Sequence, residues 1–495
     1  MLFNSYEFIF LFLPISIIIF FLLGGRGHHK IAMSWLVAAS LFFYGWWNPA
    51  YLGLIILSLL FNYAMGVALS GKVNFHSNKL VLFLGIFVNL ALIAYFKYAN
   101  FFIDNVNSLS GSSFHLEVII LPLAISFFTF QQIAYLVDAY RGEAKEYDFL
   151  QYCLFVTFFP QLIAGPIVHH KEMMPQFAKD IIYKVRYKNL AIGFSIFCIG
   201  LFKKVVLADT AALYVAPVFE LAELSGDISL YMAWSGAIAY TFQLYFDFSG
   251  YSDMAIGIAM MFGIKLPFNF NSPYKSFNII EFWRRWHMTL SRFLRDYLYI
   301  SLGGNRKGKS RRHINLMVTM ILGGLWHGAA WTFVAWGTLH GLYLVINHVW
   351  HAIRKRLGHD LSKHSFLGLF FGTMLTFIAV VISWVFFRAE SFTGAINILS
   401  AMADFSQIGA GLEIEIRFIL FVFILMFLVL VMPNSQQIVL KVTNYIGGTL
   451  KDRKGEILKH IIWRPSIFWA YFIGAIFAIS IILMERESEF LYFQF

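Results

Sequence analysis

A histidine within an uncharged stretch is the residue of this sequence best placed to carry chemistry. His327 lies in LGGLWHGAAWTFVAWGTLHG, residues 322–341, which contains no Asp, Glu, Lys or Arg. An ionisable side chain at membrane depth is costly and usually has a functional reason. A neutral histidine in an apolar tunnel can act as a general base, removing the proton of a hydroxyl that attacks an acyl thioester. Spacing alone equally allows a structural histidine bonded to a neighbouring helix.

A second histidine, His340, follows His327 by thirteen residues in the same stretch. On a continuous helix this separation turns the side chain by about 220°, at about 100° per residue. The two histidines then face different neighbours, so we expect His340 to have a structural role.

A basic and aromatic segment, residues 281–313, precedes this stretch with the sequence EFWRRWHMTLSRFLRDYLYISLGGNRKGKSRRH. Its apolar and basic residues interleave at helical spacing, which predicts a helix lying at the cytoplasmic membrane interface. Such cations could bind the phosphates of a coenzyme A or phosphopantetheine donor, or simply meet anionic lipids. His287 lies among them, where a cytoplasmic donor would enter. The donor-side candidates are Arg284, Arg285, Trp286 and Arg292, and Arg295 adds to the positive charge.

Other polar and sulfur-containing side chains in apolar segments are assigned no catalytic role. Asp247 and Asp253, in YFDFSGYSDMA, could pair with nearby arginines or cap the following helix. The two cysteines, Cys153 and Cys198, lie in separate apolar stretches, so neither a disulfide framework nor a CxxC metal site can form. We expect no bound metal.

The elements that must position these residues are membrane spans. Hydrophobic residues make up 59% of the 495 residues and charged residues 13%, which excludes an ordinary soluble domain.

The first apolar run, residues 8–23, should stay as a span, since MLFNSYEF lacks the basic start of a cleaved signal peptide. Prolines and a glycine interrupt residues 149–168, which predicts an irregular element buried in protein. Because roughly 20 apolar residues cross a bilayer, we predict about twelve spans, at 8–23, 31–47, 52–69, 80–95, 118–137, 190–206, 230–246, 314–331, 334–350, 367–387, 418–432 and 467–483.

Loop charges predict the orientation and the domain organisation. Basic loops follow the first and third spans but not the second, which places the N-terminus outside the membrane and the C-terminal tail outside as well. The formal charge of +11 therefore reflects cytoplasmic loops, and nucleic acid is not an expected partner. We predict one all-α polytopic unit over residues 1–495, with N-terminal spans at 1–140, a catalytic core at about 150–350, and C-terminal spans with the tail at 365–495.

Several long motifs occur in order along the chain. RRWHMTLSRFLRDYLYI and LWHGAAWTFVAWGTLHG, with His287 and His327, resemble the two histidine motifs of the bacterial membrane-bound O-acyltransferase (MBOAT) family, and His327 matches that family's catalytic position. The resemblance covers nearly the whole chain. The branch that contains the alginate O-acetylation membrane protein is similar in LPLAISFFTFQQIAYLVDAYRGE (121–143), FFPQLIAGPIVHH (158–170), YFDFSGYSDMA and WVFFRAES (384–391).

The resemblance implies a ring of about twelve transmembrane helices around a thin central tunnel, with cytoplasmic and extracytoplasmic funnels meeting at His327. An acyl group from acetyl-CoA or another cytoplasmic acyl thioester would cross there, with His287 on the donor side and no permanently bound cofactor. The implied partners are the lipid bilayer, an extracytoplasmic SGNH-type acetyltransferase, and an exported polysaccharide such as alginate. The implied location is the bacterial cytoplasmic (inner) membrane, with both termini extracytoplasmic.

The tail SEFLYFQF, residues 488–495, resembles a terminal aromatic motif whose tyrosine is proposed to accept the acyl group, which makes Tyr492 an acyl-relay candidate. An aromatic membrane anchor is the alternative. Two other functions stay open. One is D-alanyl transfer to teichoic acid by a related acyltransferase. The other is a polysaccharide or lipid transporter without covalent chemistry, since interrupted spans with intramembrane polar residues also suit a transporter.

Overall fold

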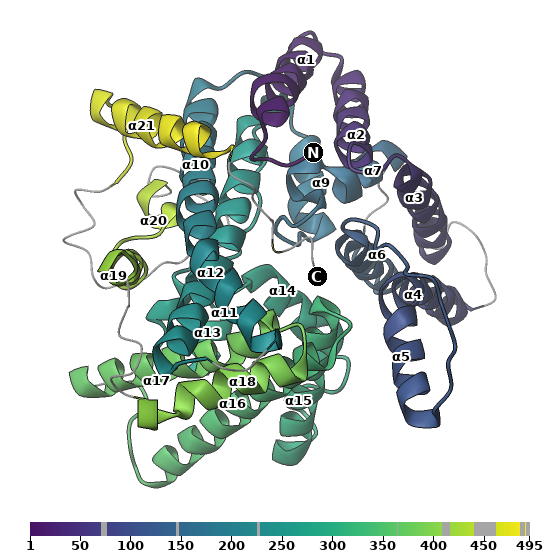
Figure 1. The fold of residues 1–495 in the computed structure, drawn as a ribbon. Helices are drawn as coiled ribbons and strands as arrows, with labels where there is room; N and C mark the ends of the chain where they lie inside the picture. The colour runs from purple at the N-terminus through teal and green to yellow at the C-terminus, as the bar shows by residue number, and fades with distance from the viewer. Residues whose placement is uncertain are drawn as a thin grey trace.

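The computed structural model describes residues 1–70, 77–144, 148–224, 228–363, 365–407, 416–439, 462–485 and 491. The regular structure of this described part consists of helices without any β-strand (Figure 1). The expected all-α, multi-pass architecture is confirmed, whereas the count of about twelve spans and the proposed subdivision of the chain stay predictions. Within the described ranges, five helical segments are long and apolar enough to cross a membrane: Phe8–Gly25, Ala50–Leu69, Asn78–Ser110, Tyr187–Leu224 and Phe366–Arg388.

The N-terminal helices follow one another along one edge of the molecule in Figure 1. One prediction in this region is wrong at its start, because the expected span at 118–137 is helical only from Ile125. Pro122 precedes it, and Ala124 has a left-handed φ of 60°, so the chain enters the helix through a turn. The helices are α1 (Leu13–Gly25), α2 (His29–Gly45), α3 (Ala50–Leu69), α4 (Asn78–Ile93), α5 (Ala99–Ser110) and α6 (Ile125–Tyr140).

The interrupted segment after α6 has the irregular, buried structure that its prolines and glycine predict. Helix α7 (Phe149–Thr157) ends before Pro160, α8 (Phe159–Leu162) is a single turn, and the chain is non-helical until α9 (His170–Phe177). Residues 152–168 are all buried. Backbone that leaves the helix at membrane depth is tolerated only in such protein surroundings.

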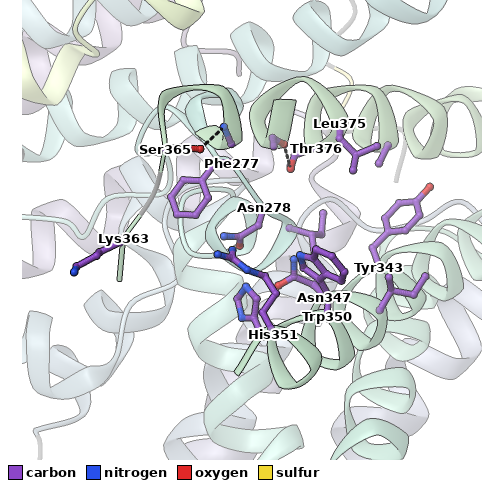
Figure 2. Close-up of a pocket in the computed structure, with 16 residues that line it drawn as sticks. Phe277, Asn278, Tyr343, Asn347, Trp350, His351, Lys363, Ser365, Leu375 and Thr376 are labelled. Atoms are coloured by element: carbon purple, nitrogen blue, oxygen red, sulfur yellow. Dashed lines mark hydrogen bonds between the residues drawn. The ribbon is translucent and has the colours of Figure 1, made fainter. Parts of the chain in front are cut away.

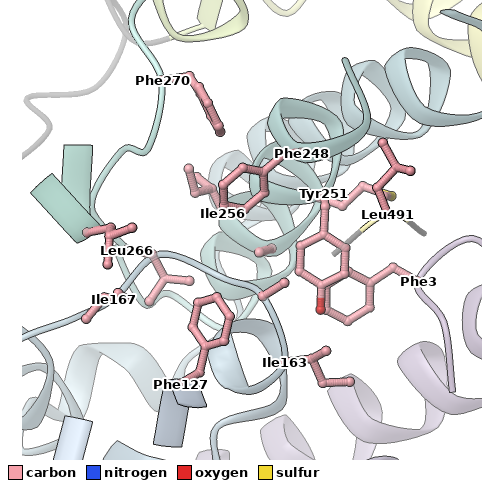
Figure 3. Packing of buried hydrophobic residues seen from close by; sticks show 14 of the residues in the cluster. Phe3, Phe127, Ile163, Ile167, Phe248, Tyr251, Ile256, Leu266, Phe270 and Leu491 are labelled. Carbon is pink, nitrogen blue, oxygen red and sulfur yellow. The ribbon is translucent and has the colours of Figure 1, made fainter. Parts of the chain in front are cut away.

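Helix α12 (Leu230–Met261) forms the centre of the fold. It continues beyond the predicted span at 230–246, and every residue from Ala239 to Met261 is buried. A helix that is apolar on all sides is expected to be enclosed by other helices. Helices α10 (Tyr187–Phe202) and α11 (Asp209–Leu224) pack along it. The aromatic packing around α12 includes Phe3 stacked on Tyr251, with Leu491 nearby (Figure 3).

Close backbone approach between α10 and α12 depends on glycine. A Cβ atom at Gly193 would lie 2.5 Å from the carbonyl oxygen of Gly257, and a Cβ at Gly257 would lie 2.5 Å from that of Gly193. Small residues at helix crossings in membranes allow this approach, where van der Waals packing replaces the hydrophobic effect.

The predicted interfacial helix over residues 281–313 is wrong as a single helix. The segment contains α13 (Ile279–Trp283), α14 (Met288–Phe293) and a π-helical turn, η6 (Leu294–Tyr299), and it breaks at His287, whose φ is 39°. The remaining α-helices are α15 (Gly308–His327), α16 (Trp331–Arg356), α17 (Phe366–Arg388), α18 (Phe392–Ala403), α19 (Ile416–Leu430), α20 (Ser435–Val439) and α21 (Ile467–Leu483).

Short π-helical and 3₁₀ segments complete the described secondary structure. The π-helical segments widen helices locally, and such turns are frequently found at functional sites. Besides η6, the π-helical segments are η1 (Phe8–Phe12), η2 (Ala94–Tyr98) and η4 (Lys203–Ala208), and the 3₁₀ segments are η3 (Asp180–Tyr183), η5 (Pro273–Lys275) and η7 (Phe405–Gln407).

Candidate active site

His327 is the last residue of α15. Gly328 leaves the helical conformation at φ −158°, and the chain resumes as α16 only at Trp331. The break lies close to the boundary between the predicted spans at 314–331 and 334–350, so the angle of about 220° calculated for a continuous helix does not apply to His327 and His340. This break places His327 at a helix end, where its backbone carbonyl has no partner within the helix.

Three aromatic rings from three helices surround the His327 imidazole. Its ring centroid lies 4.7 Å from that of Trp326, 5.2 Å from that of Trp336 on α16, and 5.1 Å from that of Phe387 on α17. The residue is only 6% exposed. The imidazole thus occupies a water-poor aromatic enclosure with a defined orientation.

Lys97 completes the end of α15. Its Nζ donates hydrogen bonds to the carbonyl oxygens of Trp326 (2.5 Å) and His327 (3.0 Å), and the neighbouring Tyr98 hydroxyl donates to Leu325 at 2.7 Å. A cation at a helix C-terminus is favoured by the helix dipole. Sequence reasoning missed Lys97, although a lone lysine near the end of an apolar run was a signal.

A small cavity of about 30 Å³ opens beside His327 and Lys97. The other walls come from the turn before α6, including Pro122 and Ala124, and from Trp326. A space of this size holds a water molecule or one hydroxyl group. The arrangement can therefore bring a hydroxyl next to an imidazole and an ammonium group.

His287, the second predicted histidine, comes close to the same indole. Its ring centroid is 6.3 Å from that of Trp326 and 4.7 Å from that of Phe248, and its Nδ1 lies 3.3 Å from the Asn269 Oδ1. The side chain is 1% exposed. The fold thus gathers His287 and His327 around Trp326, while their catalytic roles stay predictions.

His340 has a structural environment, as expected. Its Nδ1 accepts a hydrogen bond from the Trp283 Nε1 at 3.3 Å, and its Nε2 lies 2.9 Å from the Ser383 Oγ. Ser383 donates its own proton to the Val380 carbonyl, so the His340 Nε2 is the donor of the second bond. One ring nitrogen therefore accepts and the other donates, which ties this imidazole to its neighbours and leaves no free base.

The donor-side arginines differ in their surroundings. Arg292 makes a bidentate ion pair with Glu172, at 2.5 and 2.9 Å, and Arg285 pairs with Glu281 at 2.7 Å. Trp286 is buried and stacked on the Phe282 ring. Arg284 is exposed, and no ion pair involves it among the described residues. Of these candidates, Arg284 is the best placed to meet a phosphate from solvent.

A polar network that sequence reasoning did not assign connects α6, α9 and η6. The Tyr297 hydroxyl lies 3.0 Å from both carboxylate oxygens of Asp138 and 3.1 Å from the His169 Nδ1. Outside the membrane-spanning segments, burial and then the charge of Arg292 lower the pKa of His169. Burial alone would raise the pKa of Glu172, but the hydrogen bond and charge of Arg292 outweigh it and lower that pKa. The network fixes the irregular segment against the residues that follow His287.

Asp247 and Asp253 have lysine partners, so the expectation of arginine partners or a helix cap is wrong. Both lie inside α12, which continues past them. The Lys204 Nζ lies 2.7 Å from Asp247, and the Lys203 Nζ lies 2.6 Å from Asp253. Both lysines come from the π-helical turn η4. These buried pairs tie η4 to the central helix.

The acyl-relay candidate Tyr492 lies outside the described residues.

Comparison with known proteins places this geometry in context. Residues 41–387 match the sequence profile of the membrane-bound O-acyltransferase family, MBOAT. The peptidoglycan O-acetyltransferase of Helicobacter pylori is 45% identical over 435 residues, which cover 82% of this chain and 81% of that protein. The probable alginate O-acetylase AlgI of Pseudomonas putida is 42% identical over 414 residues, with 82% and 81% coverage. The teichoic acid D-alanyltransferase of Streptococcus thermophilus is 30% identical over 280 residues, covering 54% of this chain and 68% of that protein.

Proposed function

Because this chain belongs to the membrane-bound O-acyltransferase family, we propose that it transfers an acetyl group from a cytoplasmic thioester, across the membrane, to a hydroxyl of an exported polysaccharide. The names of the two most extensive relatives described above support acetyl transfer to a cell-envelope or extracellular polymer. The D-alanyltransferase relative has lower identity and covers little more than half of the chain, so acetyl is the favoured group.

The observation that carries this proposal is the position of His327 at a small cavity with Lys97. His327 removes the proton of the acceptor hydroxyl, whose oxygen attacks the thioester carbonyl carbon. The new C–O bond forms as the C–S bond breaks, and the departing thiolate takes the proton from the histidinium. The ammonium of Lys97 favours the negative charge that develops on the carbonyl oxygen. His287 orients the donor side through its contact with Trp326.

The pattern of loop charges supports the proposed sidedness, and the family resemblance supports the proposed partners. Both termini are extracytoplasmic, and the chain lies in the bacterial cytoplasmic membrane with Arg284 on the cytoplasmic side. The donor is acetyl-CoA or a carrier-bound acetyl group, and an extracytoplasmic SGNH-type acetyltransferase passes the group to the polysaccharide. Tyr492 is the relay that connects the two proteins. The neighbouring Leu491 is 3% exposed beside Phe3 and Tyr251, which supports this assignment (Figure 3).

Transfer of radiolabelled acetyl groups from acetyl-CoA in proteoliposomes tests this function. We expect label on Tyr492 in the wild type, located by mass spectrometry, and none in Tyr492→Phe. His327→Ala should lower the rate at least 100-fold, since general base catalysis contributes about 10²–10⁴-fold. The exposed His359 provides a matched control, and His359→Ala should keep full transfer.

Retention of acetyl transfer by folded His327→Ala would overturn the proposed mechanism, whereas absence of label transfer from every acyl donor would favour the transporter alternative. Absence of label from the wild type with acetyl-CoA, but its presence with an acylated carrier protein, would change the donor and keep the enzyme class.

A further inference from the structure

A second cavity lies away from His327, between α16 and α17. Its volume is about 650 Å³. Figure 2 shows Lys363 and Ser365 toward one end and Tyr343 with Leu375 toward the other, with Asn347 and Trp350 between them. The same cavity is lined by Phe277 and Asn278 from the loop before α13. The proposed acetyl transfer does not account for it.

An aromatic wall separates this cavity from the candidate active site. Tyr343 lines the cavity, and its ring centroid lies 5.8 Å from that of His340. The Trp336 ring follows, 4.8 Å from His340 and 5.2 Å from His327. Trp336 is 1% exposed, so packed side chains fill this layer. A thioester bound in the cavity would be kept away from His327, and the cavity requires a different occupant.

The dimensions and walls of the cavity fit a lipid tail. At about 1.5 Å per residue, the stretch of α16 from Tyr343 to Arg354 is roughly 16 Å long, which is about half of a hydrocarbon core of about 30 Å. Ile346 of α16 and Leu375 of α17 line the cavity and are exposed, by 63% and 71%. The cavity therefore opens sideways, where lipid chains surround the protein.

The end of the cavity at the membrane surface is cationic and polar. Arg354 and Lys363 both line it, and neither is in an ion pair within the described residues. The Asp360 Oδ1 accepts hydrogen bonds from the backbone N–H and the hydroxyl of Ser362. The Asn347 Oδ1 is buried without a hydrogen-bond partner in the described part of the chain. The cavity therefore offers two cations for a phosphate and, between its two ends, an acceptor for a hydroxyl group.

We propose that the groove between α16 and α17 binds one anionic glycerophospholipid, with the phosphate between Arg354 and Lys363 and one acyl chain along Tyr343, Ile346 and Leu375. Trp350, about one helical turn before Arg354 on α16, is the kind of residue that marks a membrane interface. Lipid binding at this site requires that the C-terminal end of α16 and the N-terminal end of α17 lie at a membrane surface. It does not depend on the acyl-transfer chemistry at His327. It adds a specific lipid to the expected bilayer contact.

Native mass spectrometry of the full chain, purified in detergent and incubated with phosphatidylglycerol, phosphatidylcholine or inorganic phosphate, tests the site. We expect one phosphatidylglycerol to be retained, and neither phosphatidylcholine nor free phosphate. Each basic residue near an anionic headgroup contributes about five-fold in affinity. Arg354→Gln/Lys363→Gln should therefore weaken binding about 30-fold. The control Lys355→Gln/Arg356→Gln removes two charges at the same helix end that do not line the groove, and should change binding less than about three-fold.

Ala379, which also lines the groove, allows a test without a charge change. Ala379→Trp should fill the groove and abolish retention of phosphatidylglycerol. This variant tests the proposal if Arg354→Gln/Lys363→Gln does not fold. Equal retention of phosphatidylcholine, an equal loss in the control pair, or full retention by folded Ala379→Trp would each overturn the proposal. Phosphate binding without lipid retention would also contradict it, since the acyl chain is part of the site.

Discussion

Lys97 and His327 are more than two hundred residues apart in the sequence, yet Lys97 holds the carbonyl of His327 itself. The hydrogen bonds from Lys97 occupy the carbonyls left free where α15 ends, so the orientation of the imidazole depends on a side chain from η2. The same ammonium lines the cavity that His327 lines. His340, although it belongs to the same motif as His327, has both ring nitrogens engaged and is separated from the cavity by Trp336.

Replacing Lys97 with methionine keeps the side-chain length and removes the charge. We expect kcat to fall about 10- to 100-fold with little change in the KM for the donor, because charge-assisted hydrogen bonds contribute about 1.5–3 kcal/mol. Steady-state kinetics of the purified variant measure both constants. Lys97→Arg should restore part of kcat. Tyr98→Phe, which loses only the bond to Leu325, should lower kcat less than about five-fold, and an equal effect of the two would contradict this role.

At the scale of elements, the segment between α12 and α15 is assembled from short helices that are fixed by side-chain contacts. His287 in a left-handed conformation separates α13 from α14, and the Arg292–Glu172 pair fastens α14 to α9. A single amphipathic helix would have placed all the arginines on one solvated face. The broken segment instead buries Trp286, pairs Arg285 and Arg292, and leaves Arg284 exposed.

Arg284 and Arg292 should therefore respond differently to substitution by glutamine. Arg292→Gln leaves the partly buried Glu172 without its partner, and we expect the free energy of unfolding to fall by about 1–3 kcal/mol. Arg284→Gln should raise the KM for acetyl-CoA about five-fold and leave the melting temperature unchanged. Thermal unfolding and initial-rate kinetics of each variant separate the two effects.

The double variant Glu172→Gln/Arg292→Gln provides the control for the ion pair. It should be more stable than Arg292→Gln alone, because no charge is left without a partner. A stable Arg292→Gln protein with a raised KM would show instead that Arg292 meets the donor.

For the whole molecule, stability depends on how closely helices approach the central helix α12. Glycines at the α10–α12 crossing bring backbones together, and the Lys203–Asp253 and Lys204–Asp247 pairs join η4 to α12. Losing one partner of such a buried pair would leave an uncompensated charge inside the fold. These contacts hold the helix around which the aromatic enclosure and the irregular segment pack.

Gly257→Ala tests the close approach. Its added methyl group would lie 2.5 Å from the Gly193 carbonyl oxygen, and we expect the free energy of unfolding to fall by about 1–3 kcal/mol through overpacking. Thermal unfolding in detergent measures the loss. Gly53→Ala, in α3 where nothing lies within 4 Å of the new Cβ, should leave stability unchanged or slightly raised. Equal melting temperatures of the two variants would contradict a tight α10–α12 crossing.

The sequence by itself determined the all-α membrane architecture, the irregular segment around Pro160 and the candidate histidines. These features are local, because apolar runs long enough to cross a bilayer form helices, and the closely spaced Pro160, Gly165 and Pro166 interrupt one such run. The motif around His327 could also be recognised from the sequence, because the uncharged residues that surround this histidine are its neighbours in the chain. The family match over residues 41–387 agrees with this interpretation.

Only the tertiary structure decided which side chains meet. The Lys97 bonds to α15, the bidentate Arg292–Glu172 pair, and the lysine partners of Asp247 and Asp253 join residues from separate elements. The end of α15 at His327 is also a tertiary outcome, since Lys97 and Tyr98 satisfy the carbonyls that the break leaves free. Helical periodicity reports which face of a segment is apolar, but it carries no information about the partner across that face. That partner is set by packing between distant segments.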